Sequence, residues 1–165
     1  MPAVERVFKP TLHHLADRIG PRLRAKSLTG RTITVRVRFA DLRSVTRALT
    51  LLEPVSTTRG LAEIAEDLVR GVLANHPEEQ TISLLAISVS NLGKHSVVQL
   101  ELPLGLLDEK RRPGSNKGMA RLRVDRAVDT IRGRFGWEAV GYGSVALGAA
   151  RSVPDEFREL AEKEL

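Results

Sequence analysis

Arginine and threonine side chains alternate with apolar ones in the stretch RTITVRVRF, residues 31–39. Because successive side chains of a strand point to opposite faces, one face of this stretch is predicted to hold Thr32, Thr34, Arg36 and Arg38. Guanidinium groups form paired hydrogen bonds with phosphate oxygens, and hydroxyl groups add further ones. The row contains no acid, so it is predicted to contact a phosphate backbone. For one strand alone, a solvated sheet face remains the simpler explanation.

No group of residues fits catalysis. His13 and His14 are adjacent, so they cannot lie on one helix face as a metal pair. The sequence contains no cysteine, no glycine-rich phosphate loop and no Ser/His/Asp set. Asp41 suits the turn of a hairpin. We therefore predict no catalytic residue, no metal site and no cofactor in this chain.

The chain has 165 residues, enough for one ordinary domain and an extension. Its net charge is +6, and residues 1–50 carry 11 lysines and arginines against three acids. This concentration indicates a polyanionic partner, although an arginine-rich coding bias would also produce it. The sequence has no apolar run near the ~20 residues of a membrane helix and begins without a signal-peptide core. We expect a cytoplasmic protein that does not enter a membrane.

Hydrophobic periodicity predicts alternating strands and helices over residues 1–94. The expected elements, in order, are a short strand at Val4–Phe8, a helix from Thr11, hairpin strands at Arg31–Ala40 and Ser44–Leu52, a helix ending near Asn75, and a strand at Thr81–Leu92. Pro21 is expected to kink or interrupt the first helix. Thr57 or Thr58 is the expected N-cap of the second.

This order, β-α-β-β-α-β, predicts an α+β, ferredoxin-like fold. Right-handed crossovers place two helices on one face of a four-stranded antiparallel sheet. The other face stays open, and Ser88 is predicted to lie there with the arginine-threonine row. Arg47 shares a strand face with the apolar residues Val45, Leu49 and Leu51, so it is expected at an edge or beside a bulge.

The remaining residues are predicted to form two further segments. Residues 95–120 combine an extended peptide with a charged, Gly/Pro-bearing linker. Residues 121–165 are expected to form an amphipathic helix at Arg121–Phe135 and then a tail. The apolar stripe of that helix is predicted to be Val124, Val128, Ile131 and Phe135.

Residues 4–94 resemble the little finger, the C-terminal DNA-binding domain of Y-family translesion DNA polymerases. The runs VRFAD (37–41), Thr46-Arg47 and SVSNL (88–92) sit at the family's spacing. The similarity is to the bacterial DNA polymerase IV type, and the ending VPDEFREL suggests an actinobacterial member. The resemblance implies the same fold, with its open sheet face in the DNA major groove.

The resemblance also implies site residues. DNA-backbone contacts are expected at Thr32, Thr34, Arg36, Arg38, Arg47 and Ser88. Ser83 stands where family members usually carry a basic residue, so one phosphate contact is expected to be weaker. The peptide QLELPL resembles a sliding-clamp-binding motif, with Gln99, Leu100, Leu102 and Leu104 as its contacts, whereas pattern alone also allows a final edge strand.

The family's polymerase chemistry uses magnesium ions held by a palm domain, which this chain lacks together with the fingers and thumb. The chain alone is therefore expected not to be an enzyme. Its predicted function is to bind damaged primer-template DNA for an error-prone lesion-bypass polymerase in DNA repair, tethered to the sliding clamp. The expected partners are double-stranded primer-template DNA, the clamp and the catalytic core, in the cytoplasm at the nucleoid. A stand-alone clamp-binding module and a ferredoxin-like RNA-binding domain are the alternatives, the latter disfavoured by the absence of aromatics from the predicted face.

Overall fold

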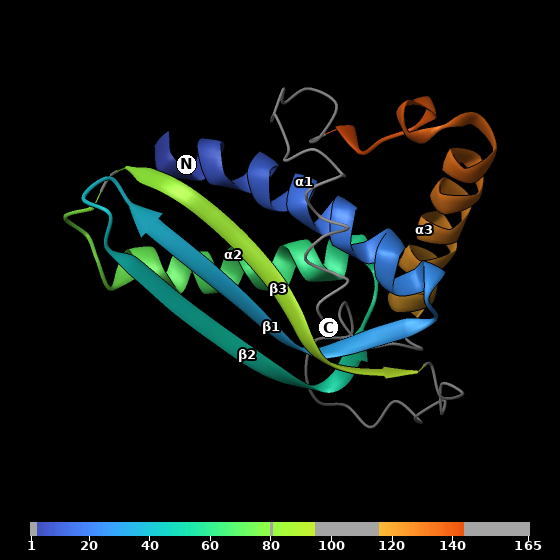
Figure 1. Ribbon diagram of the computed structural model, residues 1–165, viewed down its shortest axis with the longest axis horizontal. Helices are drawn as coiled ribbons and strands as arrows, with labels where there is room; N and C mark the ends of the chain where they lie inside the picture. The colour runs from blue at the N-terminus through green and yellow to red at the C-terminus, as the bar shows by residue number, and fades with distance from the viewer. Residues whose placement is uncertain (1–2, 80, 95–115, 144–165) are drawn as a thin grey trace.

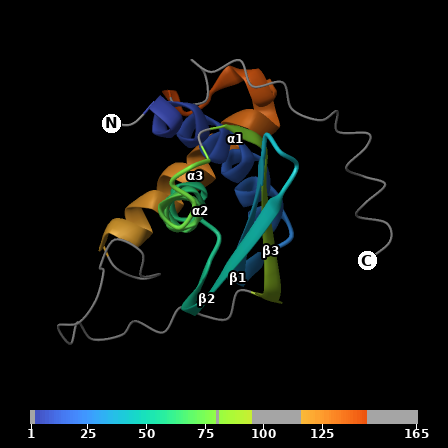
Figure 2. The ribbon, with the colours of Figure 1, turned by 90° about the vertical axis from the view of Figure 1, so that its left-hand side faces the viewer.

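The computed structural model describes residues 3–79, 81–94 and 116–143. The elements, in chain order, are α1 (Ala3–Ala25), β1 (Leu28–Phe39), β2 (Ser44–Val55), α2 (Thr58–Ala74), β3 (Ile82–Lys94), α3 (Asn116–Phe135) and the short 3₁₀ helix η1 (Trp137–Ala139). The strands form an antiparallel sheet in the order β2-β1-β3. Both α1 and α2 cover the same face of this sheet (Figures 1 and 2), which confirms the α+β class and the helical layer.

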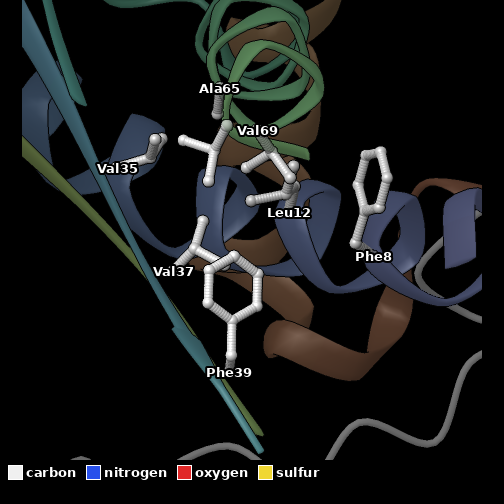
Figure 3. Packing of buried hydrophobic residues seen from close by; sticks show 8 residues of the cluster. Phe8, Leu12, Val35, Val37, Phe39, Ala65 and Val69 are labelled. Carbon is white, nitrogen blue, oxygen red and sulfur yellow. The ribbon is translucent and has the colours of Figure 1, made fainter. Parts of the chain in front are cut away.

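The core lies between the sheet and the two helices. From Ile33 onwards, every second residue of β1 is almost fully buried, namely Ile33, Val35, Val37 and Phe39. Figure 3 shows the last three of these facing Phe8 and Leu12 of α1 and Ala65 and Val69 of α2. Removing these apolar side chains from water is the main force that holds the helices on this face.

The neighbouring strands follow the predicted alternation. Leu85, Ile87 and Val89 of β3 pair with Val37, Val35 and Ile33 of β1, respectively, and pack against the core. The central strand and its partner therefore present matching apolar residues to the helices. This part of the prediction is confirmed.

The predicted short strand at Val4–Phe8 is wrong, because these residues belong to α1. The helical stripe continues N-terminally through Phe8, which is buried four residues before Leu12. Thr11 consequently lies inside the helix rather than at its start. Pro21 does not interrupt α1 either, since the next turn is anchored by buried Leu23. No fourth strand occurs among residues 3–79, 81–94 and 116–143.

Helix α3 begins at Asn116, five residues before the predicted helix, and it turns a different face inward. Its predicted apolar stripe is largely exposed: the exposed fractions are 54% for Val124, 38% for Ile131 and 66% for Phe135. The buried positions are instead Asp125 and Arg132. The charges on those two side chains find partners on α1 and α2, so polar pairing rather than apolar burial determines how α3 docks.

Candidate nucleic-acid interface

The sheet face opposite the helices carries the arginine-threonine row of β1. Register across the strands places small or polar residues, and one leucine, beside this row. On β2 these are Thr50, Ala48, Thr46 and Ser44, and on β3 they are Ser90, Ser88, Ala86 and Leu84. None of the described helices covers this side of the sheet (Figure 2). We call these twelve residues, including Thr32, Thr34, Arg36 and Arg38, the open face.

The two arginines of the open face bond to neutral groups. An Nη2 atom of Arg36 lies 3.5 Å from the hydroxyl of Ser44, and Nε of Arg38 donates to the hydroxyl of Ser83 at 3.3 Å. In contrast, Arg121 is bound by a carboxylate of Glu63. No acid belongs to the open face, so the charge of its arginines is available to an anion.

Ser83 lies in an irregularity of the β1–β3 pairing, where the register shifts between Arg38 and Phe39. Its hydroxyl donates to the carbonyl of Phe39 at 2.8 Å while accepting the Arg38 Nε–H. Ser83 thus holds the Arg38 side chain against the sheet. The sequence identified this serine only as a departure from the family, because a bulge on β3 has no composition signal there.

The other end of the open face is rich in hydroxyl groups. Thr32 and Thr50 are linked by a hydrogen bond of 3.0 Å between their hydroxyls, and Ser88 and Ser90 follow on β3. Arg31 secures the adjacent irregularity of β2 by donating to two backbone carbonyls, those of Leu51 and Leu52. Hydroxyl groups on such a surface can donate to phosphate oxygens.

Arg47 does not lie on the open face. It pairs with Val35, a core residue, and therefore has the opposite strand parity, while its side chain is exposed at the β2 edge. The pairing of β2 with β1 is regular around Arg47, so no bulge redirects its side chain. Arg47 instead lies on β2, an edge strand of the sheet, as one of the two predicted alternatives stated. Of the predicted DNA contacts, the structure brings together Thr32, Thr34, Arg36, Arg38 and Ser88. The predicted clamp contacts Gln99, Leu100, Leu102 and Leu104 lie outside the described residues.

A second polar cluster joins α3 to the start of α2, and no local sequence pattern indicated it. Asp125 accepts the backbone N–H of Thr58 at 2.9 Å and one Nη1–H of Arg24 at 3.1 Å. The hydroxyl of Tyr142 also donates to Asp125, and burial together with this bond raises the pKa of Tyr142. Thr57, the N-cap residue, makes no side-chain cap bond. Asp125 therefore caps α2 from a distant helix.

Arg24 is the centre of the same cluster. Burial lowers the pKa of Arg24, but its bond to Asp129 and the nearby charge of Asp125 outweigh this effect and raise it overall. Asp129 receives two bonds from the Arg24 guanidinium, at 2.6 and 2.8 Å. These paired bonds fix α3 to the end of α1. Figure 1 shows the ribbon of α3 beside the end of α1, at the right.

Two further features of the described residues bear on other functions. None of the described helices is long and apolar enough to cross a membrane. Among the same residues, no group of three or more His, Asp or Glu side chains is placed to hold a metal ion. The described residues therefore do not fit the magnesium site that the polymerase family implies.

Comparison with known proteins matches residues 6–102 to the impB/mucB/samB family C-terminal domain. The chain is 72% identical over 164 residues to DNA polymerase IV 2 of Mesorhizobium japonicum, covering 99% of this chain and 40% of that protein. It is 29% identical over 133 residues to DNA polymerase IV of Dehalococcoides mccartyi strain CBDB1, covering 80% of this chain and 30% of the relative. The chain thus spans less than half the length of these relatives. Neither relative supports the expected actinobacterial affiliation, which is not borne out. The match over more than half of the chain shows that it belongs to the impB/mucB/samB family, as the little finger domain of Y-family DNA polymerases.

Proposed function

We propose that this chain binds damaged or primer-template duplex DNA through the phosphate backbone, as the accessory domain of an error-prone lesion-bypass polymerase. The observation that carries the proposal is the pair Arg36 and Arg38, two cations on an uncovered sheet face whose hydrogen-bond partners there are neutral hydroxyls. Relatives that bear the name DNA polymerase IV support this use of the face.

The geometry of the open face suits a phosphate chain. Side chains two residues apart along a strand lie about 7 Å from each other, so Arg36 and Arg38 can contact different phosphates. Their lateral neighbours include Ala86 and Thr46, whose small side chains let a backbone approach the sheet. Contacts of this kind position a protein on DNA without reading its sequence.

The test is the salt dependence of duplex binding by the full chain. With about 3–5 phosphate contacts, log K is expected to fall against log salt with a slope of about −3 to −4.5. The double change Arg36→Ala with Arg38→Ala is expected to weaken binding and to reduce the slope by about 2, because two phosphate contacts are lost. Both side chains are on the sheet surface, so the fold should survive.

The matched control is Arg59→Ala with Arg123→Ala, which removes the same charge from exposed sites on α2 and α3. This variant is expected to retain the original slope within about 0.5, since neither position lies near the open face. If both double variants weaken binding equally, net charge rather than the open face governs binding. A salt-independent affinity would contradict the whole proposal.

We also propose a tether to the sliding clamp through Gln99, Leu100, Leu102 and Leu104. The support is the sequence QLELPL, in which a glutamine precedes spaced leucines that suit an extended peptide in an apolar pocket. Clamp capture by the chain should be lost after Leu102→Ala with Leu104→Ala while DNA binding remains. Persistent capture would exclude this peptide.

Nucleotide addition, in this proposal, belongs to palm, finger and thumb domains of a longer polymerase. The supporting observation is that the chain covers only 40% of its Mesorhizobium relative. Co-purification of this chain with such a catalytic core from cytoplasmic extracts would test the association. We place the protein in the cytoplasm at the nucleoid, where its DNA substrate lies.

A further inference from the structure

An apolar stripe runs along the solvent side of α3. Val124, Val128, Ile131 and Phe135 follow one another at spacings of four, three and four residues, the pattern of a helix that pairs with another element. Three of them are more than one third exposed. A neighbouring side of α3 forms its bonds to α1 and α2. The stripe itself has no partner among the described residues.

The charges beside the stripe are of one sign. The exposed charged side chains of α3 are basic, namely Lys117, Arg123, Arg126 and Arg134. Its two acids face α1 and α2, where Asp125 and Asp129 are bound by Arg24. The occupant of the stripe must therefore combine apolar side chains with acidic ones.

A second copy of α3 does not meet this requirement. Pairing two copies through the stripe would bring basic flanks together, and like charges placed side by side oppose association. The acidic C-terminal segment of the chain itself does meet it. Residues 154–165, PDEFRELAEKEL, contain five acids and two basic residues. Their apolar residues Phe157, Leu160 and Ala161 recur at helical spacing.

We propose that residues 154–165 dock on the α3 stripe of the same chain. The connection is long enough: described residues end at Gly143, and the ten residues 144–153 span up to about 35 Å when extended. Helix α3, with 20 residues, is about 30 Å long. Tyr142 starts this connection from near the middle of α3, because its hydroxyl bonds to Asp125.

The experiment uses the full chain with a single nitroxide label. The sequence has no cysteine, so Ser152→Cys creates one labelling position just before the acidic segment. Docking is expected to cause loss of the NMR amide signals of Val124 to Phe135, and the loss should not depend on protein concentration. The change Phe157→Ala with Leu160→Ala should restore these signals. Leu42→Ala, at an exposed hairpin position away from α3, is the matched control and should leave the loss unchanged.

Three results would overturn the proposal. The amides of α3 would keep their full intensity if the segment did not approach them. A loss that grows with concentration would place the segment of a second copy there instead. A loss that survives Phe157→Ala with Leu160→Ala would show that the apolar residues do not direct the contact. Unchanged signals from buried Ile33 and Val35 verify folding in each variant.

Discussion

The strongest test of the α3 attachment is to remove the carboxylate of Asp17. Arg132 donates to both oxygens of this carboxylate, each at 2.9 Å, and both side chains are buried. Arg132 also donates to the carbonyl of Val140 at 2.9 Å and lies 3.9 Å from the ring centre of Trp137. Asp17→Ala therefore leaves a buried guanidinium with only part of its original partners.

The expected cost follows from that isolated charge. Breaking a buried ion pair by removing one partner costs about 3–5 kcal/mol, a large part of the ~5–15 kcal/mol by which typical domains are stable. A chain of this size loses about 2–4 °C in melting temperature per kcal/mol, so a decrease of roughly 6–20 °C is expected. The double change Asp17→Leu with Arg132→Met should cost less, because no buried charge remains unpaired.

The assay is urea unfolding followed by far-ultraviolet circular dichroism and by tryptophan fluorescence. Trp137 is the only tryptophan of the chain and contacts Arg132, so its emission reports on this site. Asp67→Ala is the matched control, because it removes an exposed carboxylate that binds Arg70 on the same helix and should cost below about 1 kcal/mol. A loss below about 1 kcal/mol in Asp17→Ala would refute the reasoning, since an exposed pair loses as much.

Three further predictions address the open face, the helix contact and the hairpin. Ser83→Lys should add a phosphate contact and steepen the salt slope of duplex binding by about 0.9; an unchanged slope would place this position outside the interface. Gly20→Val should destabilise the fold by about 1–3 kcal/mol in denaturant titrations, because a Cβ atom at this position would lie 2.7 Å from the hydroxyl of Thr58. The control for overpacking is Gly71→Val, since a Cβ atom there would have no neighbour within 4 Å. The hydrogen bond from Arg43 lowers the pKa of Asp41 in the folded protein. The stability that this bond provides is therefore fully present above the unfolded pKa of about 3.9, and it is lost as the pH falls through the lower pKa of the folded state. An NMR titration of the Asp41 carboxyl should show a midpoint below that of an unfolded peptide, and an equal midpoint would contradict the bond.

Local periodicity predicted most of the sheet and its helices. The alternation of β1 identified both the buried Ile33 and Val35 and the outward Arg36 and Arg38, because a strand's two faces are defined by neighbouring residues. The α2 stripe was predictable for the same reason, with a period of 3.6 residues. Phe8 was misassigned because a short apolar run fits a strand and a helix equally well until its long-range contacts are known.

The attachment of α3 was not predictable from the same patterns. The apolar stripe of α3 was predicted to be its buried face. The pair that is buried instead, Asp17 with Arg132, joins residues 115 positions apart, and such a distant pairing leaves no periodic pattern in the local sequence. The same holds for Arg24, whose partners lie about a hundred residues away. In the candidate site, the register excluded Arg47 from the open face, and this required knowing which residue stands opposite it.

The bond from Asp125 to Thr58 has a consequence for the order in which the protein can mature. Domains fold from the N-terminus as the chain is synthesised, and Thr58 emerges 67 residues before the carboxylate that accepts its amide hydrogen. Helix α2, which lies under the sheet, therefore first forms without the acceptor for the Thr58 amide. A missing cap of this kind costs about 0.5–2 kcal/mol. The sheet layer that carries the open face reaches its full rigidity only when synthesis has passed α3, so a ribosome-bound or shortened chain would present the same arginines on a less rigid support.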